Sequence, residues 1–93
     1  MTNLVRQHLI FFGEVQHVGF RYEMATLAHQ AGITGWVRNK DDGTVEAEVQ
    51  GNPTAIESLL NDLAHTPPIE ISHITRSNIT FKKNEQSFRT IYY

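Results

Sequence analysis

The stretch "ITGWVRNKDDGTVEAEVQ" (Ile33–Gln50) holds two short β-rich segments on either side of "KDDG". The Asp-Gly pair within "KDDG" is a strong signal for the tight turn of a β-hairpin. In the second segment, apolar residues alternate with polar ones: Val45, Ala47 and Val49 with Glu46, Glu48 and Gln50. This alternation predicts a strand with one buried face and one face toward water, so the whole stretch predicts a hairpin.

Helical patterns flank the predicted hairpin on both sides. Before it, an apolar stripe at helical spacing is formed by Phe20, Met24, Leu27, Ala28 and Ala31. Gly32, directly after this stripe, provides a C-terminal stop. We therefore expect a first helix over roughly residues 20–31.

The segment after the hairpin, "NPTAIESLLNDLAHTPP" (residues 52–68), predicts a second helix. Its apolar side is formed by Ile56, Leu59, Leu60, Leu63 and Ala64. Asn52 and Pro53 suit a cap and a first helical turn. Two residues later, Thr54 and Glu57 offer a competing capping box, so the start of this helix stays open by two residues.

Three further segments are rich in β-branched and aromatic residues and predict strands: "VRQHLIFFGEV" (residues 5–15), "IEISHITRSNITF" (69–81) and "SFRTIYY" (87–93). The resulting order is strand, helix, hairpin, helix, strand, with a short extra strand at the end. The right-handed crossover rule places both helices on one side of the sheet. We therefore predict an α+β fold, a ferredoxin-like α/β sandwich in which an antiparallel sheet carries two helices on one face.

Length and composition limit the classes of protein. Ninety-three residues suit one domain over 1–93 with one modest core. The formal charge of −2 disfavours a general nucleic-acid binder, and the absence of cysteine excludes disulfides and thiolate sites. The start has too short an apolar stretch for a signal peptide, and nothing later approaches a membrane span. We expect a cytoplasmic monomer with neither membrane nor nucleic acid as a partner.

One loop predicts a binding site. "GEVQHVGFR" (Gly13–Arg21) joins the first strand to the first helix, so unpaired backbone N–H groups point in one direction at the start of the helix. Gly19 permits a backbone conformation that larger residues resist, and Arg21 can donate two N–H bonds to a tetrahedral oxyanion. These parts fit an anion the size of phosphate. The alternative is an Arg21 on a solvated helix face and a glycine that merely turns the chain.

Two motifs resemble those of the acylphosphatase family. "GEVQHVGFR" is similar to G-x-V-Q-G-V-x-F-R, and "GWVRNKDDGTVEAEVQG" is similar to G-W-V-x-N-x-x-D-G-x-V-x-x-x-x-x-G. The resemblance covers the whole chain and implies the ferredoxin-like sandwich. It also implies hydrolysis of acyl phosphates to a carboxylate and inorganic phosphate, without a metal or cofactor. The family's catalytic arginine and asparagine fall on Arg21 and Asn39.

The resemblance also implies a phosphate-binding loop made of Val15, Gln16, His17, Val18, Gly19, Phe20 and Arg21. Backbone amides of this loop and the Arg21 guanidinium would compensate the phosphoryl charge. The Asn39 amide would orient an attacking water, but it cannot act as a base. Because the substrate's own phosphate oxygens can accept the water's proton, a strong protein base is not obligatory.

His17 stands where the resemblance leads one to expect glycine. A positive φ at this position would cost about 1 kcal/mol or more, whereas a negative φ would leave the imidazole pointing into solvent. We expect a retained but altered activity, and we expect His17→Gly to raise turnover or phosphate affinity. An unchanged or reduced rate would show that His17 is neutral or useful.

Two other functions stay open in the sequence. One is an acylphosphatase-like phosphate-binding or regulatory domain that turns over little because of His17. The other is an RNA-recognition-like module that uses sheet-borne aromatic residues, although Glu46 and Glu48 stand where such modules carry stacking and basic residues. The five histidines show no spacing of a metal motif, so we expect no metal. The physiological acyl phosphate and the role of the C-terminal aromatic residues stay open.

Overall fold

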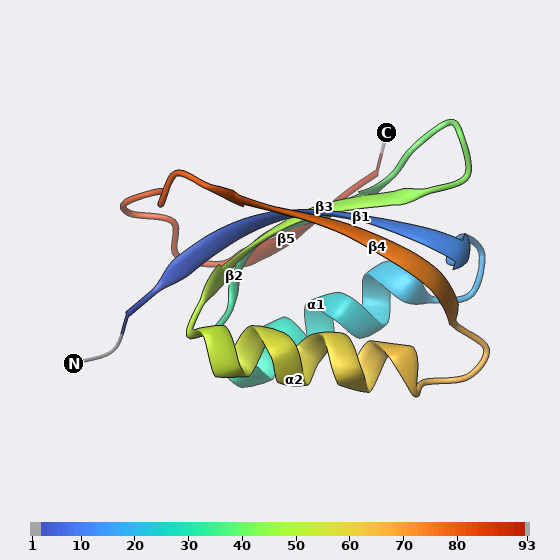
Figure 1. The fold of residues 1–93 in the computed structure, drawn as a ribbon, viewed down its shortest axis with the longest axis horizontal. Coiled ribbons are helices and arrows are strands. Elements are labelled where there is room, and N and C mark those ends of the chain that lie inside the picture. The colour runs from blue at the N-terminus through green and yellow to red at the C-terminus, as the bar shows by residue number, and fades with distance from the viewer. Residues whose placement is uncertain (1–2, 93) are drawn as a thin grey trace.

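The computed structural model describes residues 3–92 and shows a five-stranded sheet with two helices packed on one face (Figure 1). The strands are β1 (Val5–Glu14), β2 (Thr34–Asn39), β3 (Val45–Gly51), β4 (Glu70–Ile79) and β5 (Phe88–Ile91). The helices are α1 (Phe20–Ala31) and α2 (Pro53–Ala64). The predicted element order and the ferredoxin-like sandwich are confirmed. The predicted last strand extended to Tyr93, which lies outside the described residues.

The strands are arranged in the order β4-β1-β3-β2-β5. The predicted hairpin is present, because β2 and β3 pair antiparallel from Thr34 opposite Gln50 to Asn39 opposite Val45. The sheet is mixed rather than entirely antiparallel, because β5 pairs parallel to β2. The chain reverses direction once between β4 and β5, so β5 runs the same way as β1 and β2. This parallel pairing carries the end of β5 to the same side of the molecule as the end of β2.

The core lies between the sheet and the helices. The predicted face of β3 is fully buried, and the stripe of α1 contributes Phe20, Met24 and Ala28 to the same core. Ala31 and Ala64 were expected in the apolar stripes but are exposed, because each is the last residue of its helix and lies beyond the packed turns. Helix α2 begins at the first of its two predicted starts, since the Asn52 side chain accepts a hydrogen bond of 2.8 Å from the Thr54 N–H.

The outer face of the sheet is partly covered by the segment between β4 and β5. Gln50 points to this face, as the alternation predicts, but it is only 5% exposed rather than solvated. Its amide donates to the Lys82 carbonyl and accepts from the Lys82 N–H. The expectation of a wet face therefore fails at Gln50, because residues 80–87 cross over this end of the sheet.

Arg6 is the buried charge under this crossing segment, with 2% of its surface exposed. Its guanidinium forms ion pairs with Glu48 at 2.8 Å and with Glu85 at 2.7 Å, and donates to the Gln50 side-chain oxygen at 3.1 Å. Burial alone would raise the pKa of Glu85, but hydrogen bonds from Arg6 and Thr34 outweigh it and lower that pKa. Arg6 thus fastens the crossing segment to β1 and β3.

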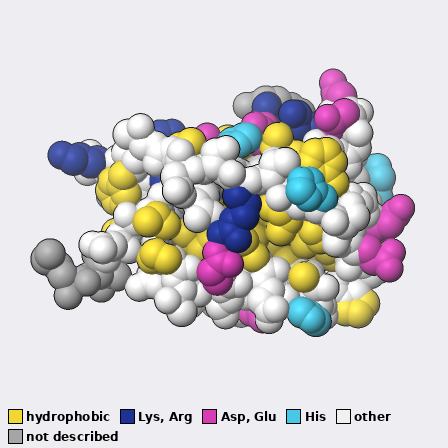
Figure 2. All heavy atoms as spheres, viewed as in Figure 1, with side chains coloured by type: hydrophobic (Ala, Val, Ile, Leu, Met, Phe, Trp, Pro, Cys, Tyr) yellow, Lys and Arg dark blue, Asp and Glu magenta, His cyan; other side chains and the backbone are white. Residues whose placement is uncertain are grey.

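The face shown in Figure 2 exposes both apolar and charged side chains. Hydrophobic side chains reach the surface between β4 and α2 (Figure 2). Ile71 and Ile74 of β4 are partly buried and pack against the core. Acidic and basic side chains on this face stand in small separate groups. Within residues 3–92, no helix is long and apolar enough to cross a membrane.

Candidate active site

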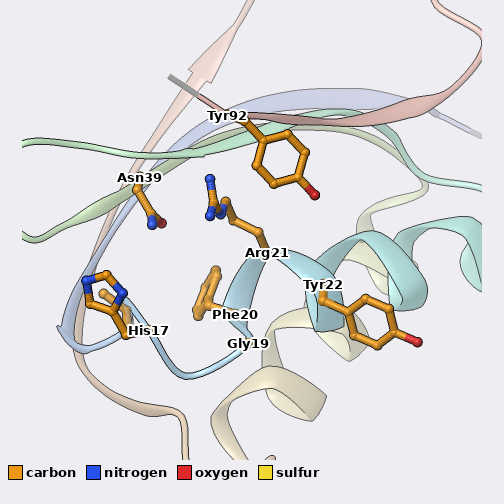
Figure 3. Close-up of a pocket in the computed structure, with 8 residues that line it drawn as sticks. His17, Gly19, Phe20, Arg21, Tyr22, Asn39 and Tyr92 are labelled. Carbon is orange, nitrogen blue, oxygen red and sulfur yellow. The ribbon is translucent and has the colours of Figure 1, made fainter.

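A pocket of about 210 Å³ opens where the β1–α1 loop (residues 15–19) meets the ends of β2 and β5. It is lined by side chains and backbone from three distant parts of the chain: Val15, His17, Gly19, Phe20, Arg21, Tyr22, Asn39 and Tyr92. Arg21 and Asn39, the two predicted catalytic residues, therefore meet in one pocket. In Figure 3 the Asn39 amide and the Arg21 guanidinium point toward one another.

Gly19 shapes the start of α1 through its backbone conformation. Its φ of 78° and ψ of 17° lie in the left-handed region, and no side chain caps the helix there. A Cβ at Gly19 would meet nothing within 4 Å, so the conformation rather than crowding explains the glycine. Phe20 is buried against Phe11, with ring centroids 4.8 Å apart, and fixes the exit of the loop. The first N–H groups of α1 are therefore available to an anion in the pocket.

Arg21 is held in place from the end of β5. Its Nη1 donates to the Ile91 carbonyl at 3.2 Å, and its guanidinium carbon lies 4.7 Å from the centre of the Tyr92 ring. The stacked ring and the carbonyl limit the directions in which the guanidinium can point. Among the described residues that line the pocket, Arg21 carries the one fixed charge, which favours an anionic ligand.

Gln16 connects the phosphate-binding loop to the hairpin that bears Asn39. Its side-chain Nε2 donates to the Lys40 carbonyl at 2.7 Å and to the Thr44 carbonyl at 2.8 Å. The Lys40 N–H also donates to the Thr44 carbonyl, so the three residues form one network. The side chain of Gln16 is thus committed to the turn, and only its backbone remains for a ligand. Val18, also predicted in the loop, packs its side chain against the core.

The turn between β2 and β3 is braced by Asp42, as expected for a turn residue. One Asp42 carboxylate oxygen accepts from the Thr44 N–H at 3.0 Å and from the Thr44 hydroxyl at 2.6 Å. These two hydrogen bonds lower the pKa of Asp42. Within residues 3–92, no three His, Asp or Glu side chains are placed to hold a metal ion. The side chains that give the pocket its polar chemistry are the Arg21 guanidinium, the Asn39 amide, the His17 imidazole and two tyrosines.

His17 adopts a left-handed backbone conformation, with φ at 62°. The sequence left the sign of φ open, and the positive value means that the loop needs a conformation in which a side chain costs about 1 to 2 kcal/mol. Histidine tolerates this region better than most residues, which explains why the loop keeps its path without the expected glycine. The side chain is exposed and lines the pocket.

Comparison with known proteins assigns the chain to a family. Residues 7–90 match the family model described as Acylphosphatase. The chain belongs to the acylphosphatase family. The acylphosphatase of Bifidobacterium longum is 49% identical over 74 residues, which are 78% of this chain and 76% of that protein. The acylphosphatase of Thermococcus kodakarensis is 42% identical over 81 residues, 87% of each chain.

A solved acylphosphatase has the same fold. The crystal structure of acylphosphatase from Bacillus subtilis superposes with a TM-score of 0.86 and 30% identity, over 97% of this chain and 100% of that chain. The acylphosphatase resemblance drawn from the two motifs is therefore confirmed for family and fold. Sequence reasoning missed Tyr22 and Tyr92 in the lining of the pocket. No spacing around the loop indicates Tyr92, because only the pairing of β5 with β2 brings it to Arg21.

Proposed function

We propose that this member of the acylphosphatase family hydrolyses the carboxyl-phosphate bond of small acyl phosphates to a carboxylate and inorganic phosphate. The observation that carries the proposal is the meeting of the Arg21 guanidinium, the uncapped start of α1 and the Asn39 amide in one pocket. A guanidinium and several backbone N–H groups match the oxygens of a phosphoryl group. An amide facing them supplies both a donor and an acceptor for a water molecule.

Phosphoryl transfer asks a protein mainly for positioning and charge compensation. Arg21 and the backbone N–H groups of the loop hold the phosphoryl oxygens and stabilise their charge in the transition state. Asn39 holds the water that attacks phosphorus. The bond between phosphorus and the acyl oxygen then breaks, and the electron pair leaves with the carboxylate. A carboxylate is a good leaving group, so a site with few charged residues suffices.

The test is hydrolysis of benzoyl phosphate in water enriched in oxygen-18, with and without EDTA. We expect equal amounts of benzoate and phosphate to be released at a rate well above that in buffer. The label should appear in phosphate, because the water attacks phosphorus, and EDTA should leave the rate unchanged. A rate equal to that in buffer would refute the enzyme, and label in benzoate would refute attack at phosphorus.

Gln16→Leu should lower kcat for benzoyl phosphate by about 10- to 100-fold, because small misplacements of reacting groups are costly. The variant removes the donor shared by the Lys40 and Thr44 carbonyls, so the hairpin that carries Asn39 is no longer fixed to the loop. Inhibition by inorganic phosphate should change less than about 2-fold, because the loop backbone and Arg21 remain. Gln86→Leu, at an exposed glutamine outside the pocket, is the control. Equal losses of kcat and of phosphate binding would contradict this positioning role.

A further inference from the structure

His17 brings a titratable side chain to the part of the pocket where the water is expected. The imidazole and the Asn39 amide both line the pocket, and in Figure 3 they lie on the same side of the Arg21 guanidinium, with Tyr92 on the other. Three other histidines engage a ring nitrogen: His8 with Glu46, His29 with the Phe88 carbonyl and His65 with the Asn61 carbonyl. Within residues 3–92, no such bond involves the ring of His17.

The backbone of His17 supports a functional reading of its side chain. A left-handed non-glycine residue is strained, and strained residues cluster at sites where the side chain has a task. Glycine would relieve this strain, and the resembling motif has glycine here. Local stability therefore does not account for the histidine. Its side chain is exposed toward the pocket, so burial in the core does not account for it either.

Resting on the proposed function, we propose that His17 is a catalytic residue that accepts a proton from the attacking water. As the water oxygen bonds to phosphorus, a water proton moves to a ring nitrogen of His17. The acyl oxygen departs with its electron pair as carboxylate, and the imidazolium returns the proton to solvent. Asn39 orients the same water but cannot take its proton, so His17 supplies the base that the rest of the pocket lacks.

The charged and titratable groups around His17 are compatible with a base. Those that share its pocket are Arg21 and Tyr22 of α1 and Tyr92 after β5. The neighbouring hollow around Asn39 adds Arg38, Lys40, Asp41 and Asp42 from the hairpin. Among the described residues that line the pocket, none is a carboxylate, so no carboxylate competes with the imidazole for the water's proton.

If His17 is the base, His17→Gly should lower turnover, which is the opposite of the increase expected from the sequence alone. His17→Gly should lower kcat for benzoyl phosphate about 10-fold near pH 8, less than the full effect of a general base, because the substrate's phosphate oxygens can still accept the proton. The wild-type kcat should fall as the pH is lowered, because a protonated imidazole cannot accept a proton, and the variant should lack this dependence. The KM of His17→Gly and its inhibition by inorganic phosphate should stay within about 2-fold of the wild-type values.

Two variants of His17 and added imidazole distinguish the loss of a base from a structural effect of the substitution. His17→Asn keeps a residue that tolerates the left-handed region but is not a base, so it should lose kcat as His17→Gly does. His17→Gly should melt about 5 °C higher than the wild type because its strain is relieved, so unfolding does not explain a lower rate. Added imidazole should restore part of the rate of His17→Gly. His73→Asn, at an exposed histidine outside the pocket, should behave as the wild type.

Different results would contradict the role of His17 and the proposed function. If the wild type is active and both His17 variants keep its kcat and its pH profile, His17 is not the base. A loss in His17→Gly that His17→Asn does not share would also overturn the proposal, because asparagine can only orient the water. A wild type without activity refutes the proposed function itself, which is a different result.

Discussion

Arg21→Gln is expected to lower kcat/KM for benzoyl phosphate about 1,000-fold or more, the loss typical of removing an arginine that stabilises a transferring phosphoryl group. Glutamine keeps a polar side chain at the start of α1 but has neither the charge nor the two-pronged donor geometry. The pocket would lose its fixed charge while its backbone N–H groups remain. The measurement is the initial rate of phosphate release at several substrate concentrations.

Two controls sharpen the Arg21 result. Arg21→Lys keeps the charge but loses the planar fork and its stacking on Tyr92, so its rate should lie between those of the wild type and Arg21→Gln. Arg89→Gln removes an exposed guanidinium of β5 outside the pocket and should leave the rate within about 2-fold. If Arg21→Gln kept a tenth or more of the wild-type rate, Arg21 would not be the main phosphate ligand.

Arg6→Met is expected to lower the free energy of unfolding by about 3 kcal/mol, the size of effect found when one partner of a buried ion pair is removed. The substitution leaves the Glu48 and Glu85 carboxylates without their shared guanidinium, beneath the segment that crosses the sheet. For a domain of this size the melting temperature should fall by more than about 10 °C. Chemical denaturation followed by circular dichroism gives the free energy.

The pH dependence of Arg6→Met provides an independent check. The pKa of Glu85 is lowered in the folded protein, so its ionised form stabilises the fold above the ordinary value of 4.5. That stabilisation is lost as the pH falls through the lower folded-state pKa. The gap in stability between the wild type and Arg6→Met should therefore narrow below about pH 4.5. A gap that stays constant from pH 7 to pH 3 would show that packing, not the ion pair, explains the loss.

The sequence predicts those features that depend on neighbours along the chain. The Asp-Gly turn, the alternation in β3 and the stripe of α1 are local patterns, and each predicts its element correctly. The two motifs place Arg21 and Asn39 in one site because they lie at fixed places on those elements. The sequence also shows that histidine stands at position 17 in place of the expected glycine, although only the structure gives the sign of its φ.

Features that depend on distant pairing are not visible in the sequence. Tyr92 reaches the pocket because β5 runs parallel to β2, and no local pattern specifies that neighbour. Gln50 follows the polar phase of β3, yet it is buried because residues 80–87 cross over it. In the sequence, Arg6 is a polar residue within a predicted strand. Its burial depends on Glu85, which lies 79 residues further along the chain.

Arg21 is anchored by β5, a short strand at one edge of the sheet. Because β5 has four residues and pairs with one neighbour, we expect it to open locally at a lower free energy than the central strands of the sheet. Each such opening releases the Ile91 carbonyl and the Tyr92 ring from Arg21. We therefore expect mild denaturing conditions to stop phosphate release before the domain as a whole unfolds.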